Sequence, residues 1–426
     1  MGDGAISVRS DVFFTFYSLL STFYFLIFRR TKMGLFDKCY EFNKKIDYLK
    51  SHHQFFYLRE MESAPAPLVR MKGKEMILLG SNNYLGLATH PKVISATIKA
   101  IQEYGTGACS SRVLTGTTTL HNRLEKKLAQ FKGTEDTIVF STGFMTMMGT
   151  IAALVKEGDM IFSDELNHAS IIEGCRLSKA EVKIYQHNNM TNLEEELATV
   201  DPSRNKLIVT DGVFSMKGTL ANLPQIKQVA DKYGAKVMVD DAHGSGVLGD
   251  KGHGILEYYN MEGQIDLICG TFSKTFATIG GFTGATAQII AFLKLNSRAF
   301  IFTASPPPAI AATVIAGLEV LEEEPQLLQQ LHHNANFMKK GLMELGFTLE
   351  ETVTPIIPVI IGNDEITFKT AGLLEEEGII VNPVVPPAVS KESSLIRVSV
   401  IATLSQRQLE IALDKFKLVG KKLGII

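Results

Sequence analysis

The chain contains the stretch Val237-Met-Val-Asp-Asp-Ala-His243, in which β-favouring apolar residues run directly into two aspartates and a histidine. A second stretch, Gly270-Thr-Phe-Ser-Lys-Thr-Phe-Ala-Thr-Ile-Gly-Gly281, holds Lys274 among small and hydroxyl residues. Each stretch is typical of a strand that ends in a polar turn. Pyridoxal phosphate (PLP) needs these two groups, an amine for a Schiff base and a carboxylate for its pyridine nitrogen. A lysine in a glycine-rich turn is more often a solvated surface residue, so the interpretation depends on the rest of the chain.

The strand-and-turn pattern repeats from about residue 136 to residue 285. Short β-rich runs alternate with longer helical segments, which indicates an α/β fold with a mostly parallel sheet covered by helices. Ligands of such sheets gather at the C-terminal strand ends, so the polar residues that follow five strands are expected to meet. The predicted strands are Thr137–Ser141, Met160–Ser163, Val182–Tyr185, Lys206–Asp211, Lys236–Asp240 and Leu267–Gly270. The polar or glycine-rich strand ends carry Gly143, Phe144, His168, Ser215, Asp240, His243, Thr271 and Lys274.

The length of 426 residues exceeds one ordinary core, and we expect four parts. Residues 1–32 form an apolar leader, residues 33–80 an N-terminal helix and arm with a hairpin at Leu68–Leu79, residues 81–312 a large cofactor-binding domain, and residues 313–426 a small α+β domain. A helix is predicted to follow Pro306-Pro-Pro308 as far as Glu323, and another to run from Pro325 to Leu345. The small domain alternates β runs at Ile356–Ile361, Ile379–Asn382 and Leu395–Val400 with helices at 365–377 and 405–423.

The leader contains an uncharged apolar run, residues 12–28, followed by the basic segment 29–32. It fits a membrane anchor with a cytoplasmic basic flank, although a helix of this length spans about 25 Å, slightly short of a ~30 Å hydrocarbon core. It fits a signal peptide less well, because the basic flank lies on the wrong side and no small-residue cleavage site follows. The third interpretation, which the crowded aromatic residues favour, is untranslated sequence upstream of a start at Met33.

Composition excludes several classes of function. The net charge of -2 provides no electrostatic basis for binding nucleic acid. The four cysteines are widely scattered, and their spacing matches neither a metal site nor a disulfide framework. We therefore expect no metal and a reducing, cytoplasmic location, with membrane association through residues 12–28 left open. The cysteines are Cys39, Cys109, Cys175 and Cys269.

Motifs that include SNNYLGL (81–87), VDDAHGSG (239–246) and GTFSKT (270–275) follow one another along residues 34–426. In these motifs the chain resembles the α-oxoamine synthase family of fold-type I PLP-dependent enzymes. Within that family it is most similar to bacterial members that condense L-serine with palmitoyl-CoA to give 3-oxosphinganine, the first step of sphingolipid synthesis. Sibling members that use alanine, glycine or cysteate remain an alternative, as does a silent regulatory subunit, although such subunits lack the lysine. The resemblance rests on SNNYLGL (81–87), SSRVLTGT (110–117), FSTGF (140–144), DELNHASI (164–171), DGVFSMKG (211–218), VDDAHGSG (239–246), GTFSKT (270–275), FTASPPP (302–308), NPVVPP (382–387) and IRVSVIAT (396–403).

The resemblance implies catalytic roles for four residues. Lys274 would hold the cofactor as an imine and act as base and acid at the substrate Cα. Asp240 would pair with the pyridinium nitrogen, whereas its neighbour Asp241 is expected to be structural. His168 would stack on the pyridine ring. His243 would bond the phenolic oxygen of the cofactor or the incoming substrate.

The remaining implied roles concern binding. Backbone N–H groups of Gly143 and Phe144, at the start of a helix, would hold the phosphate, with hydroxyl groups from Thr271 and from Thr303 of a second subunit. The chain would thus be a homodimer. Ser215 would lie near the phenolic oxygen. Arg397 would grip the substrate carboxylate in a bidentate manner, although the preceding loop, Val384-Val-Pro-Pro387, lacks an arginine found in some relatives. The asparagines of the polar loop at 81–87, Asn82 and Asn83, would reach the substrate.

Overall fold

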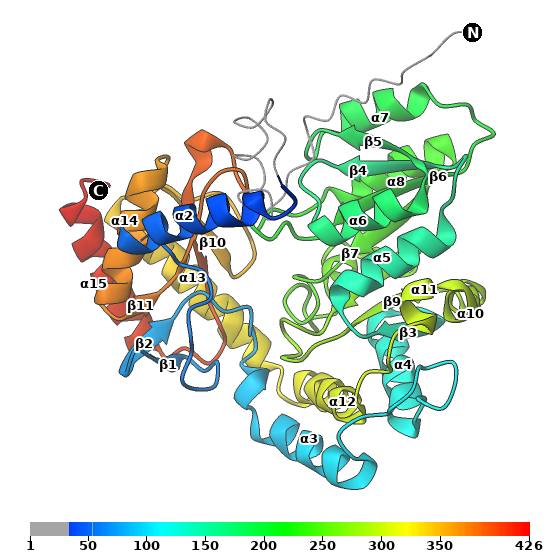
Figure 1. Cartoon of the computed structure of the whole chain (residues 1–426), viewed down its shortest axis with the longest axis horizontal. Helices are drawn as coiled ribbons and strands as arrows, with labels where there is room; N and C mark the ends of the chain where they lie inside the picture. The colour runs from blue at the N-terminus through cyan, green and yellow to red at the C-terminus, as the bar shows by residue number, and fades with distance from the viewer. Residues whose placement is uncertain (1–33, 53) are drawn as a thin grey trace.

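The computed structural model describes residues 34–52 and 54–426, which form a large unit and a smaller C-terminal unit (Figure 1). The large unit is built on a seven-stranded sheet of order β3-β9-β8-β7-β6-β4-β5. Every strand runs in the same direction except β9, which is antiparallel to both of its neighbours. The strands are β3 (Asp136–Phe140), β4 (Met160–Asp164), β5 (Glu181–Tyr185), β6 (Lys206–Asp211), β7 (Lys236–Asp240), β8 (Leu267–Thr271) and β9 (Gly281–Ala285).

The mostly parallel sheet predicted from the sequence is confirmed, and each of the six predicted strands is found with its ends displaced by at most one residue. The prediction missed β9, because its sequence Gly281-Phe-Thr-Gly-Ala285 contains two glycines and little β-branched surface. Close packing explains the first glycine. A Cβ on Gly281 would lie 2.5 Å from the hydroxyl oxygen of Thr146.

Helices cover both faces of the sheet, so the central strands are apolar on both sides. Val237 and Val239 of β7 point into one core with α4, α7, α8 and α12. Met238, between them, points into the opposite core with α5, α6, α10 and α11, as the alternation of strand side chains requires. The helices are α3 (Pro91–Tyr104), α4 (Thr119–Lys132), α5 (Gly143–Leu154), α6 (Ala169–Ser178), α7 (Met190–Ala198), α8 (Leu223–Tyr233), α9 (Ile255–Tyr258), α10 (Ala287–Asn296), α11 (Arg298–Ile301) and α12 (Pro308–Glu323).

The C-terminal unit has a core of its own, and α13 (Gln326–Leu345) joins it to the large unit. Leu331 of α13 belongs to the core of the large unit, whereas Met338 and Leu342 belong to that of the C-terminal unit. A three-stranded antiparallel sheet, β10-β13-β12, lies in this unit. The elements of the C-terminal unit are β10 (Ile356–Ile360), α14 (Asp364–Glu376), β11 (Ile379–Ile380), β12 (Asn382–Val384), β13 (Leu395–Ser399) and α15 (Gln406–Lys422). The chain also has two short 3₁₀ helices, η2 (Leu87–Thr89) and η3 (Lys391–Ser393).

The N-terminal hairpin packs against the C-terminal unit, as the adjacent blue and red ribbons of Figure 1 show. It consists of β1 (Leu68–Met71) and β2 (Lys74–Leu78), and β2 pairs in parallel with β11. Ile77 and Leu79 enter the same core as Val398. The two ends of the described chain therefore stabilise each other, and the proposed four-part division remains a prediction.

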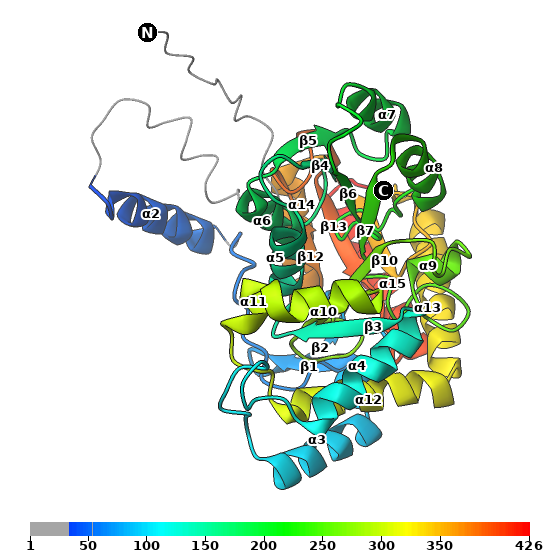
Figure 2. The same cartoon turned by 90° about the vertical axis from the view of Figure 1, so that its right-hand side faces the viewer.

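The first described helix, α2 (Asp37–Ser51), buries no side chain and stands apart from the sheet in Figure 2. Between residues 34 and 426, apart from residue 53, no helix is long and apolar enough to cross a membrane. The predicted anchor at residues 12–28 and the alternative start at Met33 lie outside the described residues.

Candidate active site

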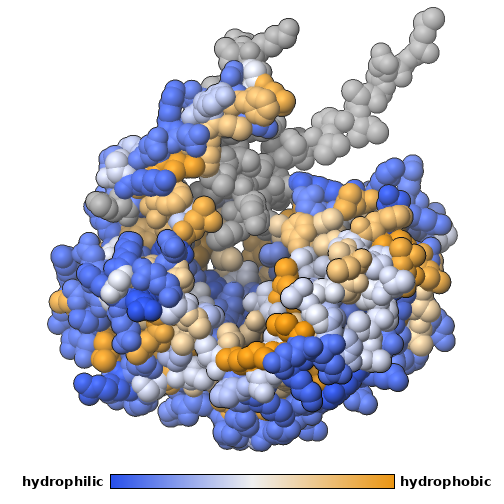
Figure 3. Space-filling model, turned by 60° about the horizontal axis from the view of Figure 1, so that its bottom comes forward, coloured by the Kyte–Doolittle hydropathy of each residue, from blue (hydrophilic) through white to orange (hydrophobic). Residues whose placement is uncertain are grey.

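The strand ends that were expected to meet do meet, around one cavity of about 390 Å³. Its walls come from the C-terminal ends of β3, β4, β6, β7 and β8, the edge at which parallel sheets bind ligands. In the space-filling view, apolar residues gather beside the hollow between the two units (Figure 3). The predicted residues that line the cavity are Gly143, Phe144, His168, Ser215, Asp240, His243, Thr271 and Lys274.

A tight loop after β8 carries Lys274. The N–H of Phe272 and the hydroxyl of Thr271 donate to the Gly280 carbonyl at 2.9 and 3.0 Å, and the N–H of Thr278 donates to the Phe272 carbonyl at 3.0 Å. Gly280 has a φ of 125°, and a Cβ there would lie 2.6 Å from the Phe272 ring. The loop can therefore close only with glycine at this position, and closure places Lys274 against the cavity.

The amine of Lys274 has no hydrogen-bond or ion-pair partner among the described residues. Burial lowers the pKa of its ammonium group to about 8, although the carboxylates of Asp240 and Asp211 oppose the shift. A substantial part of this amine is therefore neutral near physiological pH. A neutral amine is the form that can attack a carbonyl carbon or take a proton.

Two strand-final aspartates, Asp240 of β7 and Asp211 of β6, stand in register beside each other. Burial raises the pKa of Asp240 to about 6, and the Lys274 charge and the N–H of Ala242 limit the rise. Burial and the Asp240 charge raise the pKa of Asp211 much further. The sequence analysis missed Asp211, although its position at the end of a predicted strand was the signal that could have identified it.

Both cavity histidines are neutral at physiological pH. His168 caps α6, where its Nδ1 accepts from the Ser170 N–H at 3.3 Å, and burial with the nearby Lys274 charge lowers its pKa to about 4. Burial and the same lysine hold the pKa of His243 well below its usual range. His243 Nδ1 lies 2.7 Å from the hydroxyl oxygen of Tyr84, a fully buried residue that the sequence analysis did not select.

One rim of the cavity suits an anion. Thr142 caps α5 by accepting from the Met145 N–H at 3.0 Å, which leaves the N-terminal N–H groups of this helix directed outward. A Cβ on Gly143 would lie 2.6 Å from Thr271 Oγ1, so the backbone and that hydroxyl are in close contact. The hydroxyl of Ser273, another residue missed in the sequence, lies 2.9 Å from Thr271 Oγ1.

Arg397 of β13 is nearly buried beside the cavity and links the two units. Its Nε donates to the Ser215 carbonyl at 2.6 Å, one terminal nitrogen to Ser399 Oγ at 2.7 Å, and the other to Asn82 Oδ1 at 3.1 Å. The adjacent Asn83 does not line the cavity, because its amide nitrogen donates to the Pro65 carbonyl at 3.0 Å. Asn83 holds the loop at 81–87 in place.

Thr303, like Asn82, Asn83 and Arg397, is a predicted site residue that does not line this cavity. It lies in the segment after α11, where Ala304 forms an antiparallel bridge with Ser111. Its assignment to the site of a second subunit remains a prediction.

The residues present fit PLP. They supply an unpaired amine for the aldehyde, a carboxylate for the pyridine nitrogen, an imidazole beside the ring space, and helix N–H groups with hydroxyls for a phosphate. A Cβ at Gly143 would collide with Thr271, so the backbone at this position stays bare, which is consistent with an anion held close to the backbone. No group of acidic, histidine and cysteine side chains in the described part of the chain forms a metal site.

Comparison with known proteins shows the family, the fold and the cofactor. The family described as aminotransferase class I and II matches residues 74–416. A serine palmitoyltransferase (SPT) from Sphingobacterium spiritivorum is 43% identical over 380 residues, covering 89% of this chain and 95% of that protein. An 8-amino-7-oxononanoate synthase from Thermoanaerobacter pseudethanolicus is 44% identical over 384 residues, covering 90% and 97%. A solved structure of SPT with PLP superposes with a TM-score of 0.89 at 35% identity, covering 93% of this chain and 100% of the other.

Proposed function

The chain belongs to the aminotransferase class I and II family and, within it, to the PLP-dependent α-oxoamine synthases, and we propose that it condenses L-serine with a long-chain acyl-CoA. With palmitoyl-CoA the product is 3-oxosphinganine, released with CO₂ and CoA. The observation that carries the PLP chemistry is the Lys274 amine, which has no partner among the described residues and lines the same cavity as Asp240.

Lys274 and Asp240 are assigned the central chemistry. PLP, when bound, withdraws electrons from the substrate Cα. Asp240 keeps the pyridine nitrogen protonated, and the amine of Lys274, released when the substrate amine takes its place, removes the Cα proton. Cα then attacks the thioester carbonyl, the C–S bond breaks and CoA leaves. Loss of CO₂ and return of a proton from Lys274 to Cα complete the reaction.

The neighbouring residues position the reactants. His168 would pack against the cofactor ring, and His243 with Ser215 would hydrogen-bond its phenolic oxygen. The N-terminal N–H groups of α5 and the hydroxyl of Thr271 would hold its phosphate. Arg397 holds the substrate carboxylate, with Asn82 fixing its guanidinium.

The acyl group is assigned from the charges around the cavity. An enzyme that makes 8-amino-7-oxononanoate has to accommodate a second carboxylate at the far end of its acyl chain. Among the described residues that line the cavity, Lys274 is the only lysine or arginine. Arg397, beside the cavity, is already assigned to the carboxylate of the amino acid, so neither cation is left for a second carboxylate. This distribution supports an apolar acyl chain over a dicarboxylic one.

A second candidate, an 8-amino-7-oxononanoate synthase, is favoured by sequence identity that matches that of the SPT relative. The test adds serine, alanine and glycine singly to the PLP-loaded protein and follows the absorbance of the cofactor. Saturation with serine, followed by CO₂ release with palmitoyl-CoA, supports the proposal. Saturation with alanine alone, with turnover only on a dicarboxylic acyl-CoA, refutes it in favour of the second candidate.

A homodimer is also part of the proposal, because Thr303 does not line the cavity of its own chain. Mixing a Lys274→Ala chain with a Thr303→Val chain tests this. If each site uses Thr303 from the partner, the mixed dimer contains one site that lacks both residues and one complete site. The complete site should bind PLP with the wild-type Kd, which neither parent does. Mixed dimers that bind PLP no more tightly than the parents contradict a shared site.

A further inference from the structure

A buried ion pair lies next to the cavity but does not touch it. Lys132, the last residue of α4, bonds Asp241 with 2.7 Å between Nζ and Oδ2, and their side chains are 2% and 1% exposed. The same ammonium group donates to the carbonyl of His253. Burying two charges is costly and often contributes little net stability, so such a pair is a candidate for a specific task.

Hydrogen bonds connect this pair to the two turns that carry Asp240 and Lys274. Asp241 directly follows Asp240, and its N–H donates to the Cys269 carbonyl of β8 at 2.8 Å. The hydroxyl of Ser245 donates to Asp241 Oδ2 at 3.1 Å. Thr275, which directly follows Lys274, donates from its hydroxyl to the Ser245 carbonyl at 2.8 Å. The pair thus anchors the turn after β7 and the turn after β8 to each other.

Glycine backbone packs directly against this connection. A Cβ on Gly244 would lie 2.0 Å from Asp241 Oδ1, and one on Gly254, which has a φ of 104°, would lie 1.8 Å from Asp241 Oδ2. A Cβ on Gly246 would lie 2.2 Å from the Thr275 methyl group. The backbone at Gly244 and Gly254 therefore packs directly against the Asp241 carboxylate, with no room for a side chain at either position.

The charge of Lys132 offsets that of Asp241, which lies close to both Asp240 and Lys274. Asp241 acts electrostatically on both cavity groups, because its negative charge raises the pKa of Asp240 and that of Lys274. Lys132 compensates that charge at close range. Glu257 of α9 and His253 are the other titratable groups that act on the pair.

We propose that Lys132 is a positioning residue for the cofactor site: by neutralising and anchoring Asp241, it sets the charge next to Asp240 and fixes the turn that carries Lys274. The inference rests on the roles proposed for Lys274 and Asp240, and it adds a residue of α4 that never contacts the cofactor. A visible absorbance band in the wild-type holoenzyme tests those roles separately.

The test compares K132M, D241N and the double variant K132M/D241N as holoenzymes. K132M leaves a carboxylate uncompensated, so the midpoint of the pH titration of the visible band should rise, and the Kd for PLP should increase by about tenfold, the equivalent of one pKa unit. D241N removes that carboxylate, so its midpoint should fall. The double variant should return the midpoint close to that of the wild type.

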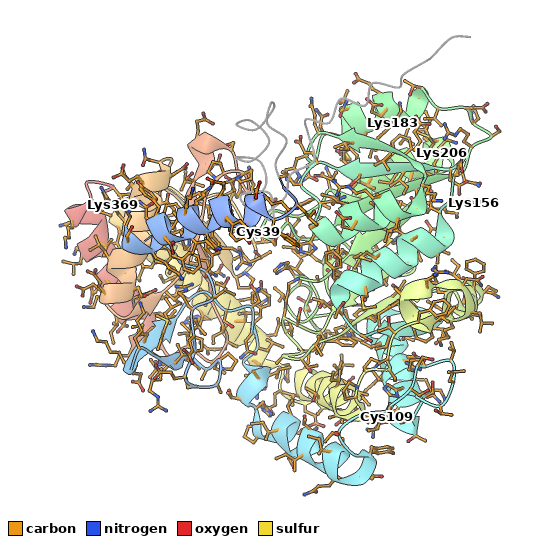
Figure 4. All side chains as sticks on the ribbon, viewed as in Figure 1. Cys39, Cys109, Lys156, Lys183, Lys206 and Lys369 are labelled. Atoms are coloured by element: carbon orange, nitrogen blue, oxygen red, sulfur yellow. The ribbon has the colours of Figure 1, made fainter. Side chains whose placement is uncertain are left out.

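K206M is the matched control. Lys206 is also buried and its ammonium group donates to the carbonyls of Pro202 and Arg204, but it begins β6 at the opposite end of the strands from the cavity (Figure 4). K206M should lower the melting temperature while leaving the Kd and the midpoint unchanged.

The proposal is wrong if K132M folds and keeps the wild-type Kd for PLP and the wild-type midpoint. It is also wrong if K132M and D241N shift the midpoint in the same direction. If K132M does not fold, D241N decides: a lower midpoint supports the proposal, and an unchanged one overturns it. Loss of the visible band from the wild type itself would instead refute the proposed function.

Discussion

Capture of PLP by the apoenzyme is expected to follow the titration of Lys274. Burial lowers the pKa of this ammonium group from 10.5 to about 8, and only the neutral amine attacks the aldehyde. At pH 7.5 about a quarter of the amine is neutral with a pKa of about 8, against about a thousandth with a pKa of 10.5. The capture rate should therefore exceed that of an unshifted lysine by roughly two hundredfold. The rate should fall as the pH drops below about 8 and level off above it.

The perturbation that tests the cause is Asp240→Asn. The Asp240 carboxylate favours the ammonium form, so its removal should lower the pKa of Lys274 further and move the midpoint of the capture rate to lower pH. Stopped-flow absorbance between about pH 6 and about pH 10 measures the midpoint for both proteins. Lys274→Ala reports the background reaction of the other lysines. A wild-type midpoint near 10.5, or a higher midpoint in the Asp240→Asn protein, would refute this account of the site.

Three further substitutions test separate parts of the cavity. Gly143→Ala should weaken PLP binding by about tenfold, because the added Cβ would lie 2.6 Å from the Thr271 hydroxyl oxygen. Gly372→Ala is the control and should bind PLP normally, because its Cβ would meet only one carbon of the Phe56 ring, at 3.7 Å. Arg397→Lys should raise KM for serine by tenfold or more, since an ammonium group cannot replace the fork of a guanidinium; an unchanged KM would remove Arg397 from the substrate site. Tyr84→Phe should cost about 1 kcal/mol of stability and shift the pH profile of turnover, because the buried His243 loses its hydrogen-bond partner at 2.7 Å. Thermal unfolding measures the first effect, and kcat as a function of pH measures the second. An unaltered pH profile would make the contact purely structural.

Several features of the site could be predicted because they are local. Strands β4, β6, β7 and β8 are runs of apolar residues buried on both faces, and each ends in a polar turn, so the positions of Asp240 and Lys274 follow from short stretches of sequence. The rule that parallel strands present their carboxyl ends at one edge then brings these residues together without further information. The resemblance to a known family added roles for them, and the matching of residues 74–416 confirms the family.

Other features depend on contacts between distant segments. Tyr84 and His243 are 159 positions apart, and nothing in the local pattern of either predicts their hydrogen bond. Strand β9 is recognisable only from its two antiparallel neighbours, because its glycines are selected by close packing and not by strand propensity. The pairing of β2 with β11 likewise joins the first hairpin to the C-terminal unit.

The stretches around Asp240 and Lys274 thus decide the fold class and the cofactor, because strand periodicity and turn chemistry are properties of neighbouring residues. The state of the lysine is decided by the tertiary structure. Burial lowers its pKa, and the carboxylates of Asp240 and Asp211 oppose the shift. The nearby charge of Asp241 is paired with Lys132, next to the cavity. Desolvation and Coulomb interactions depend on distances in space, and only the folded chain sets those distances.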